Sequence, residues 1–88
     1  MTTPRVIAKV APRYSDEALL RKIQGTVELE LVVTRDGRAR DIRIVRSLDP
    51  VLDERAIAAL DGWRFEPGRL AGAPVDVVVT VMLDFRIW

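Results

Sequence analysis

Apolar and polar residues alternate along two stretches of the chain. Every odd position is apolar within Thr26–Thr34 and throughout Val75–Ile87, the longest such pattern in the sequence. Successive side chains of a β-strand point to opposite faces, so both stretches predict strands with one buried face. Arg35-Asp36-Gly37 separates the first from a third apolar stretch, residues 38–46, whose two isoleucines should face inward. Because Asp-Gly tolerates the positive φ angles of tight turns, these neighbours are expected to form a hairpin.

Residues 15–17, Ser-Asp-Glu, have the pattern of a helix start. The hydroxyl can cap the first turn, and the carboxylates can face its free amides. Leu19 and Ile23 follow at a spacing that would place both on one side of a helix. Gly25 lies where a left-handed cap would end it.

Asp49-Pro50 predicts the start of a second helix, because aspartate caps and proline is favoured at the first helical position. Asp53 and Glu54 are expected to complement the helix dipole, and Gly62 to mark the end. The predicted apolar stripe consists of Leu52, Ala56, Ala59, Leu60 and Trp63.

Together these elements predict an α+β fold, a three-stranded antiparallel sheet with two helices packed on one face. Residues 63–67 read as a short extended corner and residues 68–74 as a loop. Residues 5–10 are expected to form an additional edge strand or an extended arm. Three strands leave two open edges, and the terminal strand has few charged side chains to prevent pairing with another strand. Its exposed backbone therefore either promotes aggregation or forms the binding site of the molecule.

The composition narrows the function further. The chain has 88 residues, 49% of them hydrophobic, and a net charge of +1, which describes one small domain. The lack of histidine and cysteine removes the commonest general base, thiolate nucleophiles and the commonest metal ligands. The near-balanced charge argues against a nucleic-acid binder, and the sequence shows neither a membrane helix nor a signal peptide. A non-enzymatic binding module without a cofactor is expected.

Several short motifs resemble the C-terminal domain of the TonB family of energy transducers, from about Pro12 to Phe85. The resemblance is carried by Pro12-Arg13-Tyr14, Gly25-Thr26-Val27, Asp36-Gly37, Ser47, Leu52-Asp53 with Ala56, Trp63-Arg64-Phe65-Glu66-Pro67 and Gly72-Ala73-Pro74-Val75. It divides the chain into an N-terminal arm, residues 1–11, and a TonB-like domain, residues 12–88. The positions expected to hold the fold are Gly25, Asp36, Gly37, Trp63, Phe65 and Pro67.

The resemblance implies a periplasmic domain of a protein anchored in the inner membrane and coupled to an ExbB/ExbD-like motor driven by the proton gradient. Its partner would be an outer-membrane transporter, whose extended N-terminal peptide adds as a strand along the terminal strand. Strand addition to an open edge is a known recognition mode, in agreement with the residue pattern. The expected partner-binding residues are Arg13, Tyr14, Val75, Val77, Val78, Val79, Thr80, Val81, Met82 and Leu83.

The sequence departs from the family pattern in two places. Ser15 follows Tyr14 where the family usually has proline, and Ala11 stands where the best-known transducers have glutamine, which puts a polar contact to the transporter in doubt. The membrane anchor and its spacer are also absent. The chain is therefore expected to be an excised fragment, a stand-alone domain or the tail of another membrane protein, such as a sensor.

Some features have two interpretations. Trp63 and Phe65 are expected in the core rather than in a ligand platform, and Tyr14 is either an anchor or a partner contact. The pairs at 16–17 and 53–54 are interpreted as helix-start carboxylates, not as catalytic acids and bases. The five arginines between residues 35 and 46 are interpreted as a solvated face rather than a polyanion site.

The terminal edge also has rival uses. It could pair with a second copy of the domain, for example by strand exchange, or dock a neighbouring domain. Alternatively, Arg5–Val10 could pair with it and inhibit binding, in which case deleting the first ten residues should tighten peptide binding.

Overall fold

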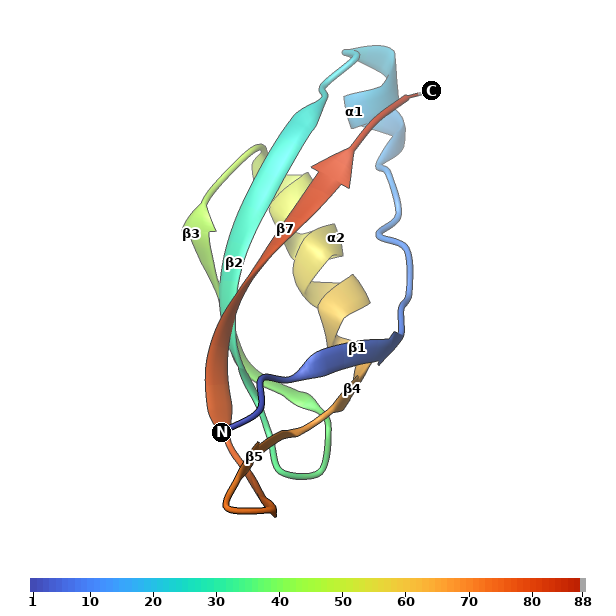
Figure 1. Ribbon diagram of the computed structural model, residues 1–88. Helices are drawn as coiled ribbons and strands as arrows, with labels where there is room; N and C mark the ends of the chain where they lie inside the picture. The colour runs from blue at the N-terminus through green and yellow to red at the C-terminus, as the bar shows by residue number, and fades with distance from the viewer. Residues whose placement is uncertain (88) are drawn as a thin grey trace.

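The sheet at the centre of the molecule has three antiparallel strands in the order β3-β2-β7 (Figure 1). A computed structural model describes residues 1–87. Its central strand β2 spans Gly25–Val33, β3 spans Ala39–Arg46, and β7 spans Val77–Phe85. These strands, together with two helices, confirm the α+β fold predicted from the sequence.

One face of the sheet is covered by the helix α2, Pro50–Asp61 (Figure 1). The predicted apolar stripe of this helix is buried, as are all four alternating residues of β2, from Val27 to Val33. The shorter helix α1, Asp16–Leu20, lies near one end of the sheet and buries Ala18. Among residues 1–87, no helix has the length and hydropathy needed to span a membrane.

The predicted hairpin joins β2 to β3. Gly37 has a φ of 80°, and the Thr34 amide donates to the Arg38 carbonyl at 2.8 Å. A Cβ at Gly37 would lie 2.2 Å from the Phe65 carbonyl oxygen. The turn therefore needs glycine for both its backbone angle and its close packing.

The first helix is shorter than the sequence predicted. Ser15 caps it by accepting from the Ala18 amide at 3.1 Å, but the left-handed residue after it is Lys22, with a φ of 54°, not Gly25. Gly25 instead begins β2. Because the helix ends before a second turn, Leu19 and Ile23 do not share a face: Leu19 is 43% exposed, whereas Ile23 packs against the core.

The predicted loop at residues 68–74 is a small hairpin formed by β5, Gly68–Leu70, and β6, Ala73–Val75. Ala71 and Gly72 both have positive φ, which suits a two-residue hairpin turn. The predicted strand Val75–Ile87 is therefore divided, because Val75 pairs with Gly68 and β7 begins only after Asp76.

The N-terminal arm pairs away from the central sheet. β1, Arg5–Ala8, runs antiparallel to β4, Arg64–Glu66, which lies within the predicted corner. Farther along, the Trp63 indole donates to the Val10 carbonyl at 2.9 Å. The hypothesis that Arg5–Val10 pairs with the terminal strand is therefore wrong, because β1 pairs with β4 and belongs to a different sheet from β7.

Candidate functional site

The outer edge of β7 is open. All nine residues of β7 are aligned with β2, from Val77 opposite Val33 to Phe85 opposite Gly25, and β7 pairs with no other strand among residues 1–87. In an antiparallel pair, alternate residues point both backbone polar groups away from the neighbouring strand. Every second residue of β7 therefore presents an amide and a carbonyl to this edge.

The side chains beside the open edge are largely apolar. On the face away from α2, Val78 and Met82 are 61% and 65% exposed, and Thr80 lies between them. On the α2 face, Val77, Val79 and Val81 are half-buried, whereas Leu83 is buried. β7 contains neither proline nor lysine, two residues that commonly protect an edge strand from pairing. Its backbone can therefore accept another strand.

Three of the predicted contact residues, Val75, Tyr14 and Arg13, do not lie along this edge. Val75 belongs to the β5–β6 hairpin. Tyr14 packs edge-on against Phe85, with ring centroids 5.4 Å apart, and its hydroxyl donates to the Ile23 carbonyl at 2.6 Å. The tyrosine thus ties the segment before α1 to the end of β7.

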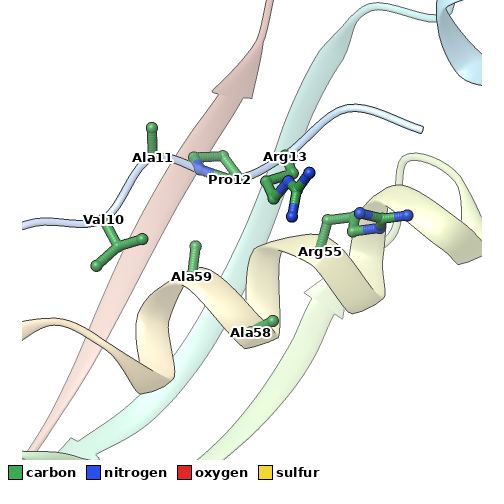
Figure 2. A pocket seen from close by; sticks show the side chains of 7 residues that line it. All are labelled: Val10, Ala11, Pro12, Arg13, Arg55, Ala58 and Ala59. Atoms are coloured by element: carbon green, nitrogen blue, oxygen red, sulfur yellow. The ribbon is translucent and has the colours of Figure 1, made fainter. Parts of the chain in front are cut away.

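Arg13, the other predicted contact before α1, lines a groove between this segment and α2 (Figure 2). The groove has a volume of about 310 Å³ and is lined by Val10, Ala11, Pro12, Arg13, Arg55, Ala58 and Ala59. The sequence interpretation missed Arg55. The sequence offers one signal for it. Arg55 precedes Ala58 and Ala59 by three and four positions, so these small residues lie beside it on the same face of the helix and leave space there.

The positions expected to hold the fold lie around the core and its turns. Trp63 and Phe65 are buried with ring centroids 6.1 Å apart. Asp36 is exposed in the β2–β3 turn beside Gly37, and Pro67 lies half-buried between β4 and β5. A Cβ at Gly25 would lie 2.7 Å from Leu48 Cδ1, so this glycine allows a close approach of the two segments.

Most of the hairpin arginines face carboxylates. Arg43 Nε donates to Glu30 at 2.9 Å, and Arg40 pairs with both Asp41 and Asp76 at 3.4 Å. The Arg35 amide donates to Asp76 at 2.8 Å, and this bond, followed by the charges of Arg40 and Arg35, lowers the pKa of Asp76. These contacts favour a solvated, internally paired face over a polyanion site.

The carboxylates at the two helix starts also have structural contacts. Glu17 pairs with Arg21 at 3.7 Å, one helical turn later. Asp53 is buried and accepts from the Ser47 hydroxyl and the Leu48 amide. Within residues 1–87, no three acidic side chains gather in a way that could hold a metal ion.

The fold and the unpaired outer edge of β7 define a small α+β domain with a long, regular edge strand. The family model for the Gram-negative bacterial TonB protein C-terminal matches residues 10–87, so the chain belongs to this TonB C-terminal family. The solution NMR structure of the Pseudomonas aeruginosa TonB CTD is similar, with a TM-score of 0.80 and 31% sequence identity, over 99% of this chain and 89% of that one.

Whole TonB proteins match as well. The chain is 32% identical to protein TonB of Klebsiella pneumoniae over 85 residues, covering 96% of this chain and 33% of that protein. It is 35% identical to protein TonB of Pseudomonas aeruginosa over 77 residues, covering 86% of this chain and 22% of that protein. The chain thus spans between about a fifth and about a third of the length of the curated relatives it matches.

Proposed function

We propose that this chain is the periplasmic binding module of a TonB-like energy transducer. It captures an extended peptide from the N-terminus of an outer-membrane transporter by pairing it with β7. Residues 12–88 form the binding domain in this proposal, although Trp88 lies outside the described residues. An inner-membrane anchor and an ExbB/ExbD-like motor would couple the captured transporter to the proton gradient.

The observation that carries this proposal is the open edge of β7, nine residues long and bordered by Val78, Thr80 and Met82. A strand added along it would form on the order of eight backbone hydrogen bonds. Each contributes about 0.5–1.5 kcal/mol net, and part of the sum is lost in ordering the peptide. We therefore expect binding in the micromolar range or weaker, with little dependence on the peptide sequence.

An amide-shift titration with peptides from the N-termini of transporters of the same organism tests this proposal. We expect the largest shifts at residues 77–85. Each peptide is also prepared in two forms, N-methylated at alternate positions, either odd or even. Since only every second peptide amide faces β7, one form should lose binding and the other should retain it.

Equal binding of both N-methylated forms would contradict strand addition, as would shifts confined to β3 or to the helices. The rival function is association of two copies of the domain through the same edge. A dimer that persists when peptide is added at saturating concentration, without shifts in β7, would favour that rival. Measuring the molecular mass across protein concentrations separates the two.

A further inference from the structure

The groove between residues 10–13 and α2 combines a charged end with an apolar one. Figure 2 shows that Arg13 and Arg55 line the same end of the groove, although one comes from the segment before α1 and the other from the helix. Val10 and Ala59 line the opposite end (Figure 2). A ligand that fills this groove must match both ends.

The charged end forms no ion pair within the described residues. Five other arginines form ion pairs, whereas neither Arg13 nor Arg55 forms an ion pair or a side-chain hydrogen bond with any residue in the range 1–87. Two positive charges that line one groove favour an anion in it. Planar guanidinium groups match the geometry of a carboxylate especially well.

The apolar part of the groove is lined by small residues. Val10 and Ala58 are exposed, whereas Ala59 is buried. The volume of about 310 Å³ is at the lower limit for a small-molecule site. It therefore suits one or two side chains of a polypeptide, where burial of an apolar side chain adds to the ionic contact.

We propose that this groove binds an acidic residue and its apolar neighbour from a partner polypeptide. The carboxylate lies between Arg13 and Arg55, and the apolar side chain packs on Val10 and Ala58. The segment that forms the groove continues to Tyr14, which contacts Phe85 at the end of β7. Assigning the acidic residue to the same peptide that pairs with β7 rests on the proposed function, but recognition of the carboxylate does not.

The probe for this site is acetyl-Leu-Glu-Leu-amide, which is too short to cover β7, and its Gln counterpart. In an amide-shift titration at low salt, the Glu probe should shift residues 10–13 and 55–59, and the Gln probe should bind about fivefold more weakly. Arg55→Gln should reduce affinity for the Glu probe to the same extent and leave the Gln probe unchanged.

Arg38→Gln is the matched control, because this arginine is exposed on the hairpin and lies outside the groove. It should leave both affinities unchanged. The variant Arg55→Glu should in turn prefer a probe with lysine in place of glutamate. Unfolding temperatures of all variants verify that the fold is intact.

Equal affinity for the Glu and Gln probes would overturn the inference, as would shifts outside the groove. Inorganic phosphate that shifts the same residues as strongly at equal concentration would also overturn it, in favour of a general anion site. These outcomes are independent of the β7 titration with transporter peptides. Groove shifts without β7 shifts would refute the proposed function alone, and β7 shifts without groove shifts would refute this inference alone.

Discussion

Asp53 stabilises the junction between β3 and α2 through specific hydrogen bonds, in addition to the interaction with the helix dipole that the sequence predicted. Its carboxylate accepts from the Ser47 hydroxyl, from the Leu48 amide at 3.0 Å and from the Asp49 amide at 3.4 Å. Asp49 itself caps the helix by accepting from the Val51 and Leu52 amides, each at 3.1 Å. The two aspartates therefore satisfy the backbone donors at the start of α2 together.

Replacing Asp53 by alanine should lower the free energy of unfolding by about 2–3 kcal/mol, because buried donors lose their acceptor. Chemical denaturation monitored by circular dichroism measures this loss. Glu54→Ala is the matched control, since Glu54 is exposed in the same turn and should change stability by less than about 0.5 kcal/mol. Similar losses in both variants would show that helix-start charge, rather than buried hydrogen bonding, matters here.

Asp76 connects the start of β7 to the β2–β3 hairpin, and its stabilising effect should depend on pH. The amide of Arg35 and the charges of Arg40 and Arg35 lower the pKa of Asp76 below the ordinary aspartate value of about 4. A carboxyl group whose pKa is lowered by folding stabilises the protein above its unfolded pKa. That stabilisation disappears as the pH falls through the folded pKa.

We therefore expect Asp76→Asn to lower the unfolding temperature at pH 6, with a difference from the original protein that shrinks below about pH 4. In an Arg40→Gln background the same substitution should have a smaller effect at pH 6, because one of the charges is gone. A difference that is constant between pH 3 and pH 6 would mean that ionisation of Asp76 does not contribute.

At the scale of elements, β7 combines strong pairing on one side with none on the other. Its register with β2 is continuous over the whole strand, so its inner edge is well held. β3, the opposite edge strand, has an irregular register with β2 and a left-handed residue at Asp41. Irregularities of this kind hinder further pairing, so β7 is the better template for an added strand.

Lysine at both Val78 and Met82 should weaken peptide binding about fivefold, because charged side chains beside an edge disfavour pairing. Both positions are exposed, so stability should change by less than about 0.5 kcal/mol for each. Peptide titration and thermal unfolding measure the two effects. Val45→Lys, on the exposed part of β3, is the control and should leave binding unchanged. An equal loss in this control would place the binding edge elsewhere.

At the scale of the whole molecule, the N-terminal arm supports the end of the domain that holds β4. The molecule is elongated, with extents of 49 × 21 × 17 Å. β1 pairs with β4, Val6 packs against the core, and the Thr2 amide donates to the Arg69 carbonyl at 2.9 Å. Around Gly68 the arm also comes close to Val77 at the start of β7, but within residues 1–87 it forms no backbone pairing with β7.

Deleting residues 1–9 should therefore lower the free energy of unfolding by about 1–2 kcal/mol, mainly through loss of the partly buried Val6. The affinity for a strand-forming peptide should stay the same, because β7 gains no free backbone. Denaturation and peptide titration of the shortened chain measure both quantities. Tighter binding after the deletion would restore the self-inhibition hypothesis.

Features that depend on a few neighbouring residues could be predicted from the amino-acid sequence alone. The alternating residues of β2, the Asp49-Pro50 helix start and the Asp36-Gly37 hairpin follow from local backbone geometry, and each was predicted correctly. The same local rules failed at α1, where the chain leaves the helix after Leu20, and at Asp76, where the predicted strand is interrupted and the side chain contacts a distant hairpin.

Which distant segments lie together depends on the packing of the whole chain. The pairing of β1 with β4 and the position of Arg13 and Arg55 along one groove involve residues far apart in the sequence, and the open edge of β7 depends on the same packing. Alternation shows that a strand has a buried face, but not which backbone lies beside it, because every strand offers the same hydrogen-bonding groups along both edges. The choice among those partners depends on how the whole chain buries its apolar side chains.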